Sequence, residues 1–210
     1  PRITPKARRL EKISYEEMLE LASLGAKVLQ TRSVELAMNH RVPVRVLSSF
    51  EGPVPSPNTG TLVCDEEQIV EKQVVSGVAY SRDEAKFSMI GVEDHPGVAA
   101  TIFGALADAG VNVDMIVQAS AKTEGRQNIV FTCPDRDAGH ARSVLEQLNG
   151  DVGYESLVVA RDVAKVSVIG VGMRSHAGVA KTMFQALSDK GINIQVISTS
   201  EIKISVLIDA

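Results

Sequence analysis

The sequence predicts an α+β protein: two β-α-β-β-α-β units, the second of them truncated, preceded by the C-terminal piece of an α/β domain. Three observations lead to this prediction. A segment in the middle of the chain is repeated near its end, apolar residues follow strand and helix periods in turn across that segment, and residues 1–75 contain no copy of it. The 210 residues suffice for one large or two small domains.

The repeat is visible by eye. Residues 86–91, Lys-Phe-Ser-Met-Ile-Gly, match residues 165–170, Lys-Val-Ser-Val-Ile-Gly, and residues 95–112 match residues 176–193. The register is kept throughout, apart from two extra residues in the second copy before His176. A single repetition is too short for a solenoid, so the repeat indicates two homologous domains.

The first copy begins with Phe87–Val92, a short apolar run rich in branched residues, which predicts a buried strand. Asp94 is a candidate N-cap for the helix that follows, whose apolar residues recur at steps of three and four until Gly110 ends it. The further elements expected are two strands, a helix and a closing strand, over residues 111–118, 128–133, 134–148 and 157–161. They form a small antiparallel sheet backed by two helices on one face.

The second copy repeats this order only in part. The expected elements are a strand, a helix and two strands, over residues 166–172, 179–190, 192–199 and 203–208. The closing helix and strand are absent from the sequence. A sheet that lacks its last strand has an unpaired edge, so we expect an incomplete copy.

The N-terminal segment has a different pattern. Ser14 and Glu17 have the spacing of a capping box, which predicts a helix from about Tyr15. A second helical stretch is expected at Ser33–Met38, and the alternating valines of Val42–Leu47 predict a strand. Residues 51–61 hold three prolines and two glycines, as expected of a surface loop or linker. The segment is too small to be a domain alone and is expected to end a larger α/β domain.

Composition excludes several classes of protein. The net charge of −4 argues against a non-specific nucleic-acid binder, and aromatic residues make up only 4%, too few for an RNA-recognition sheet. No apolar run approaches the ~20 residues of a membrane helix, and the basic N-terminal segment lacks the apolar core of a signal peptide. The two cysteines cannot form a disulfide framework, so we expect a cytoplasmic protein. No spacing of His, Cys or carboxylates resembles a metal site.

Seven motifs, in the right order along the chain, carry a resemblance to one family. They are Pro1–Pro5, Tyr15–Ala22, Gly25–Leu29, Arg32–Ala37, Asn58–Leu62, Val78–Tyr80 and Ile197–Leu207. The chain resembles bacterial aspartate kinase (aspartokinase), from the end of its α/β amino-acid-kinase domain into a pair of regulatory ACT domains with the ferredoxin-like fold. The implied division is a catalytic-domain piece at 1–65, a linker and leading strand at 66–84, one ACT domain at 85–162 and an incomplete one at 163–210.

This resemblance implies that the parent protein is an ATP:L-aspartate 4-phosphotransferase of lysine, threonine and methionine biosynthesis, which uses ATP and Mg. The family's catalytic residues lie mostly upstream of Pro1, so we expect the fragment to be inactive alone, with no catalytic residue, metal or cofactor of its own. Arg2 is the one residue that matches an element close to the family's nucleotide site.

For the ACT pair, the resemblance implies binding of threonine, lysine or both as allosteric effectors, between ACT domains that pack side by side. An amino acid needs donors for its carboxylate, which a helix N-terminus offers, and acceptors for its ammonium, which polar residues of the following strand offer. Asp94 or Asp114 would hold the ammonium; the second copy has Gln195 in place of Asp114, so we expect the first copy to be the main ligand reader. The expected effector residues are Asp94, His95, Gly97, Val98, Ala99, Asn112, Asp114 and Gln118 in the first copy, and His176, Gly178, Val179, Asn193 and Gln195 in the second.

Structural roles are open alternatives for these residues. Gly97 and Gly178 could serve only as tight helix starts, and Asn112 and Asn193 could satisfy backbone groups after a helix. His95 and His176 could be surface residues, and Lys86 is interpreted as part of a solvated face.

A second function stays open beside the feedback-regulated kinase fragment. It is a stand-alone ACT-type subunit that binds amino acids and assembles with a kinase chain, although residues 1–64 would be surplus in it. In either case we expect self-association through ACT domains, as a homodimer or mixed tetramer. The linker around residues 51–71 would pass the effector's influence to the kinase domain.

Overall fold

The computed structural model describes residues 4, 6–50, 59–69, 74–176 and 178–210. Arg2 and much of the expected linker, residues 51–58 and 70–73, therefore lie outside the described residues. The chain divides into two compact units, and the second repeat contributes to both of them. The first unit comprises Pro1–Tyr80, Ser167–Met183 and Thr199–Ile204, and the second comprises Ser81–Val166, Phe184–Ser198 and Ser205–Ala210.

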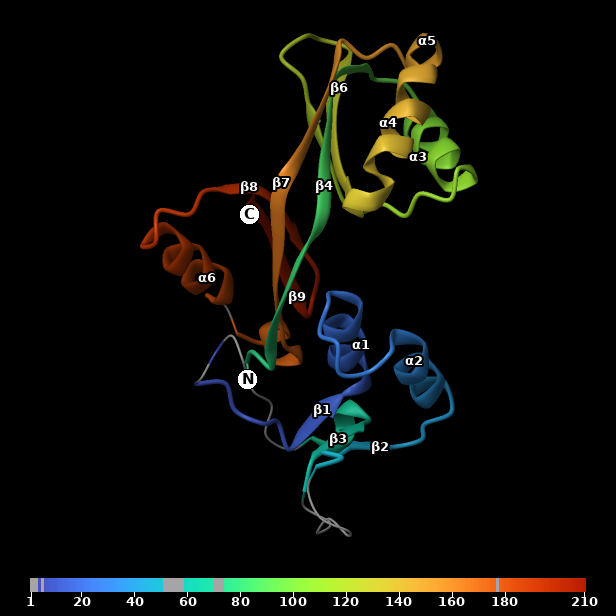
Figure 1. Ribbon diagram of the computed structural model, residues 1–210. Helices are drawn as coiled ribbons and strands as arrows, with labels where there is room; N and C mark the ends of the chain where they lie inside the picture. Colours follow the sequence, from blue (N-terminus) through green and yellow to red (C-terminus); the bar gives the residue numbers. More distant parts are fainter. Residues whose placement is uncertain (1–3, 5, 51–58, 70–73, 177) are drawn as a thin grey trace. The chain divides into compact units, whose positions relative to one another are not determined.

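The first unit contains a three-stranded sheet that packs with helices α1 and α2 (Figure 1). Its strand order is β1-β3-β2, with β3 parallel to β1 and antiparallel to β2. The apolar sides of the helices pack with the strands in one buried cluster, at whose centre Ile13, Val34 and Val63 are almost fully buried. The elements are β1 (Lys12–Ser14), α1 (Tyr15–Ser23), α2 (Thr31–Asn39), β2 (Val44–Val46), β3 (Thr61–Cys64) and the short 3-10 helix η1 (Glu66–Gln68).

Helix α1 begins where the sequence predicts. Ser14 Oγ accepts a hydrogen bond from the backbone N–H of Glu17 at 3.2 Å, and Glu17 Oε2 accepts one from the backbone N–H of Ser14 at 3.1 Å. This reciprocal pair satisfies two N–H groups that the first turn of a helix leaves without partners. The predicted capping box is confirmed, and Tyr15 is the first helical residue.

A six-stranded sheet has the order β5-β6-β4-β7-β9-β8. Strand β6 is antiparallel to both of its neighbours, which confirms the expected antiparallel arrangement. Strand β7 joins the closing strand expected of the first copy to the opening strand expected of the second without a break. The strands are β4 (Gly77–Glu93), β5 (Asp114–Ser120), β6 (Arg126–Cys133), β7 (Ser156–Ile169), β8 (Ile194–Thr199) and β9 (Lys203–Asp209).

The helices of the first copy pack on one face of β4 and β6 (Figure 1). They are α3 (Val98–Asp108), α4 (Ala138–Gln147), which follows the 3-10 helix η2 (Asp135–Asp137), and the one-turn α5 (Asn149–Val152). Gly110, with a φ of 73°, follows the last turn of α3, as predicted. The N-cap prediction for Asp94 is wrong, because α3 starts at Val98 after Gly97.

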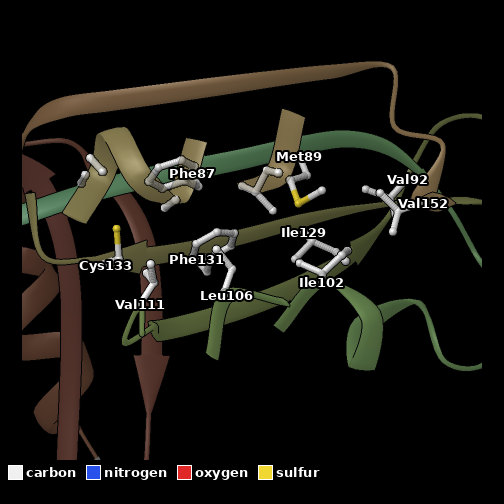
Figure 2. Packing of buried hydrophobic residues seen from close by; sticks show 14 of the residues in the cluster. Phe87, Met89, Val92, Ile102, Leu106, Val111, Ile129, Phe131, Cys133 and Val152 are labelled. Carbon is white, nitrogen blue, oxygen red and sulfur yellow. The ribbon is translucent and has the colours of Figure 1, made fainter. Parts of the chain in front are cut away.

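The core of this copy is centred on aromatic rings (Figure 2). Phe87 of β4 stacks on Phe131 of β6 with ring centroids 5.1 Å apart, and Phe103 of α3 meets Phe131 edge-on at 5.5 Å. Ile102 and Leu106 of α3 are fully buried in the same cluster. The stripe of apolar residues at helical spacing therefore packs against alternate residues of the strands, as the periodicity predicts.

The second copy provides the 3-10 helix η3 (Val171–Arg174), helix α6 (Val179–Ser188) and strands β8 and β9. Helix α6 has no buried residue in the described chain. None of the described helices is long and apolar enough to cross a membrane.

Replacement of Phe131 tests the core. Phe131→Ala removes a fully buried ring with two aromatic neighbours and should lower the free energy of unfolding by about 3–5 kcal/mol in urea denaturation. Phe50, which is 98% exposed, provides the matched control: Phe50→Ala should change it by less than about 0.5 kcal/mol. Equal effects of the two substitutions would contradict the packing described.

Candidate functional site

The first predicted effector loop connects β4 to α3. Asp94, His95, Gly97 and Ala99 are exposed, whereas Val98 is buried in the core. Gly97 adopts a φ of 98°, a left-handed conformation that favours glycine, and a Cβ there would meet no atom within 4 Å. Because the N-cap has no side chain, no side-chain oxygen caps α3. The N–H of Val98 donates to the carbonyl of His95 at 3.3 Å, so the N–H groups of Ala99 and Ala100 are the ones that a ligand carboxylate would meet at this helix start.

Asp114, the first residue of the following strand, lies toward the opposite end of β6 from Asp94. Glu93, next to Asp94, pairs with Arg126 at the start of β6, whereas Asp114 pairs with Thr132. These partners are six positions apart on β6, about 20 Å at ~3.3 Å per residue. One copy of the fold therefore does not bring Asp94 and Asp114 together. Gln118, which pairs with Ile129, lies between these two ends. A ligand that contacts both Asp94 and Asp114 would therefore need two copies of the fold.

The remaining predicted residues are distributed as follows. Asn112 and Gln118 are exposed, the latter on β5. In the second copy, His176 and Gly178 are exposed and precede α6, whose first residue is Val179. Those three residues belong to the first compact unit, whereas Asn193 and Gln195 belong to the second.

Asp114 already holds an ammonium group, that of Lys165. Lys165 Nζ lies 2.8 Å from Asp114 Oδ2 and 2.6 Å from Glu84 Oε1. The side chains of Lys165 and Glu84 are 8% and 7% exposed, whereas that of Asp114 is 52% exposed. The second oxygen of Asp114 accepts a hydrogen bond from the backbone N–H of Met115 at 2.8 Å. An effector ammonium at Asp114 would have to share this carboxylate with Lys165.

A second polar contact lies on the same side of β4 as Glu84, since alternate residues of a strand share a face. Lys86 donates to Gln195 Oε1, and Gln195 Nε2 donates to Asp209 Oδ1. Lys86 is half-buried in this contact, which differs from the solvated face expected for it. The amide of Gln195 is thus held at both ends by charged partners.

Two cavities adjoin predicted residues of the second copy. One, of about 270 Å³, is lined by Gln195 together with apolar residues of β5, β6 and β8, namely Val117, Val130, Ile194, Val196 and Ile197. The other, of about 360 Å³, is lined by Asn193 together with Phe184, Ser188, Gly191, Ile192 and Ile194. Both cavities are large enough for a small ligand, although the walls of the first are mainly apolar.

Burial and charge oppose each other at Lys165. Burial lowers the pKa of the ammonium, but the hydrogen bonds and charges of Asp114 and Glu84 more than offset this and raise the pKa above 10.5.

The Cys133 thiol is the second buried group with a shifted pKa. Burial raises the pKa of this thiol to about 11, with nearby carboxylates adding to the shift. That thiol is therefore protonated at neutral pH and a poor nucleophile. Among the described residues, no group of three or more His, Cys, Asp or Glu is placed to hold a metal ion.

Lys165 and Glu84 were not among the residues predicted to form the site. The available signal was the lysine that opens both copies of the repeat, at Lys86 and Lys165, immediately before a buried strand. A charge repeated within an apolar pattern indicates a paired group, because an unpaired buried charge is costly.

Family profiles match three stretches of the chain. The amino acid kinase family matches residues 1–48, and the ACT domain matches residues 89–152 and, through a second profile, residues 166–210. These stretches follow one another in the order that the motifs indicate.

Similar proteins match the same regions. An aspartate kinase of Pseudomonas putida is 52% identical over 211 residues, which cover 100% of this chain and 50% of the relative. The regulatory subunit of aspartate kinase from Thermus thermophilus, in a ligand-free crystal structure, is 42% identical, with a TM-score of 0.61, 66% of this chain and 90% of that chain covered. Escherichia coli aspartokinase III, in a complex with lysine and aspartate, is 26% identical, with a TM-score of 0.72 and coverage of 100% and 45%.

Lys165 gives a test of the buried ion pair. Lys165→Met leaves Glu84 buried without its cation and should lower the free energy of unfolding by about 3–5 kcal/mol in urea denaturation at pH 7. Arg161→Met breaks the exposed pair with Asp135 and should cost at most about 1 kcal/mol. Because the pKa of Lys165 is raised, its contribution to the difference between wild type and Lys165→Met should be kept up to the unfolded value near ~10.4 and be lost only in more alkaline solution. A loss of that difference between pH 6 and 9 would contradict the assignment.

Proposed function

Since the chain belongs to the aspartate kinase family, from the end of the amino acid kinase domain through two ACT domains, we propose that it is the regulatory part of an aspartate kinase. The observation that carries this proposal is the order of the matches, a kinase-family segment followed directly by two ACT domains. The chain spans about half the length of the curated relatives it matches.

The proposed reaction of the parent enzyme is transfer of the γ-phosphoryl group of ATP to the 4-carboxylate of L-aspartate. Such transfer depends on Mg²⁺ and cationic groups around the phosphates. Since the chain spans about half of the matched aspartate kinases, the 210 residues alone are expected to be catalytically inactive. Their contribution to the enzyme is control of its activity.

Threonine, lysine or both are the proposed effectors. Each carries a carboxylate that fits the uncapped start of α3 at Gly97, and an ammonium that fits the exposed carboxylate of Asp94 beside it. The similarity to Escherichia coli aspartokinase III, whose crystal structure contains lysine, supports this ligand class. Effector binding would favour one packing of the ACT domains, with a coupling to catalysis of about 1–3 kcal/mol.

Self-association is part of the proposal. Asp94 and Asp114 lie near positions of β6 about 20 Å apart, so a ligand held at the loop of one ACT domain would reach Asp114 only on a second domain. Domains packed side by side, in a homodimer or a mixed tetramer, would supply such a pairing.

A stand-alone regulatory subunit is the second candidate. The similarity to a regulatory subunit of Thermus thermophilus, 90% of which is covered, favours it. The match of residues 1–48 to the kinase family favours the fused arrangement, because a separate subunit would not need that segment.

Titration calorimetry with threonine and with lysine tests the proposed binding. We expect at least one of them to bind, and Asp94→Ala should weaken that binding by about tenfold or more, since a hydrogen bond to a charged group contributes ~1.5–3 kcal/mol. Asp108→Ala is the matched control, because Asp108 is an exposed aspartate at the opposite end of α3 and should leave the affinity unchanged. Absence of binding of both amino acids at millimolar concentration would contradict the proposal.

A further inference from the structure

Glu17 is a buried carboxylate in the kinase-family segment. It lies in the first turn of α1 and is 2% exposed. One of its oxygens, Oε2, completes the capping box with the backbone N–H of Ser14. A capping box needs only that one oxygen and functions well at a solvent-exposed helix start, so helix capping does not explain the burial of the charge.

The other oxygen joins two segments distant in sequence. Oε1 of Glu17 accepts hydrogen bonds from Ser76 Oγ at 2.6 Å and from the backbone N–H of Val171 at 2.8 Å. Ser76 directly precedes β4, and Val171 is the first residue of η3. The three hydrogen bonds to this buried carboxylate are charge-assisted and therefore stronger than hydrogen bonds between neutral groups. All of these residues belong to the first compact unit.

Residues 74–76 and 169–170 are also in close backbone contact. The N–H of Ser76 donates to the carbonyl of Ile169 at 2.8 Å, and the N–H of Gly170 donates to that of Ile202 at 2.9 Å. A Cβ on Gly170 would lie 2.3 Å from the carbonyl oxygen of Val74, so only glycine allows this approach. A displacement of the chain at residues 169–171 must therefore also displace residues 74–76, just before β4.

Hydrogen bonds continue from Val171 to the second predicted effector loop. Nδ1 of His176 lies 2.9 Å from the carbonyl oxygen of Gly172, which also accepts a hydrogen bond from Ser175 Oγ at 3.3 Å. His176 is the first predicted effector residue of the second copy. The turn that positions His176 is thus the turn whose first N–H is bound by Glu17.

In the first copy, the end of the first strand has a different hydrogen-bond partner. Gly91 is the counterpart of Gly170 in the repeat, and its N–H donates to the side chain of Asn128 at 3.0 Å. That partner lies on β6, within the same ACT domain. Only the second copy has the end of its first strand bound by a side chain from the kinase-family segment, among the residues that the structure describes.

We propose that Glu17 is a positioning residue that couples the effector loop of the second ACT domain to helix α1 of the kinase segment. This inference rests on the proposed function and assigns its route of regulation. A ligand that shifts the turn at 171–176 changes the geometry of the Val171–Glu17 hydrogen bond, and the buried carboxylate transmits that change to α1 and Ser76. Because coupling is reciprocal, aspartate and ATP at the kinase domain must alter effector affinity through the same contact.

Glu17→Gln in the full-length aspartate kinase that carries this chain tests the proposal. The amide keeps the shape and can still accept at Oε1, but its Nε2 cannot accept the Ser14 N–H and the charge is lost. We expect the effector concentration for half-maximal inhibition to rise about fivefold or more, the lower end of typical allosteric coupling. Effector affinity by calorimetry, without substrates, and the uninhibited kcat and KM for aspartate should stay unchanged. Glu35→Gln, an exposed glutamate on the neighbouring helix α2, should change none of these quantities.

Ser76→Ala is the milder variant and keeps the test valid if Glu17→Gln fails to fold. It removes one donor to Oε1, so inhibition should weaken by about two- to tenfold, the range of a single hydrogen bond. Ser23→Ala, which removes a hydroxyl that donates to the carbonyl of Glu20 within α1, is the control.

Three outcomes would overturn the coupling. Unaltered inhibition of Ser76→Ala and of any folded Glu17→Gln, in an enzyme whose wild type is inhibited, overturns it and leaves the proposed function intact. Equal loss of effector affinity and inhibition overturns it too, because Glu17 would then shape the binding site. A wild-type enzyme insensitive to threonine and lysine overturns the proposed function and the coupling with it.

Discussion

Strand β4 has an apolar face and a face that carries a buried carboxylate. The structure of the second unit depends on packing both faces. On one face, Phe87 and Met89 pack into the apolar core under the helices. On the other, the buried carboxylate of Glu84 requires a cation, which Lys165 supplies from β7. An uncompensated charge at this depth would destabilise the fold by several kcal/mol. The ion pair therefore couples the start of the second repeat to the sheet of the first.

Local patterns predicted much of this fold because their causes are local. The Ser14–Glu17 capping box forms within one turn of chain, and the repeat with its apolar periods gave the strands and helices of both copies. The N-cap at Asp94 was wrong because Gly97, in a left-handed conformation, starts the helix three residues later. The partners of Lys165 could not be predicted, since Asp114 lies 51 positions away and pairing at that distance depends on the tertiary structure.

In the candidate site, too, the local structure could be predicted from the sequence, whereas contacts between residues distant in the sequence could not. The loop before α3 has the exposed, uncapped helix start that an amino-acid carboxylate needs. Sequence alone could not show that Asp94 and Asp114 lie at opposite ends of the sheet, because strand register emerges only in the folded chain. Nor could it relate Glu17 to Val171, which are 154 positions apart. We propose that ACT domains together recognise the ligand, and that a contact of the kinase-family segment transmits its binding.

The central claim is that an effector bound at the ACT domains alters helix α1 through the turn at η3. Hydrogen exchange measured by mass spectrometry on the full-length wild-type enzyme, with and without the inhibitory amino acid, tests it most directly. The account predicts that amide exchange in η3 and in α1 changes over the same range of effector concentration. A change in η3 with no change in α1, at saturating and inhibiting effector, would contradict it.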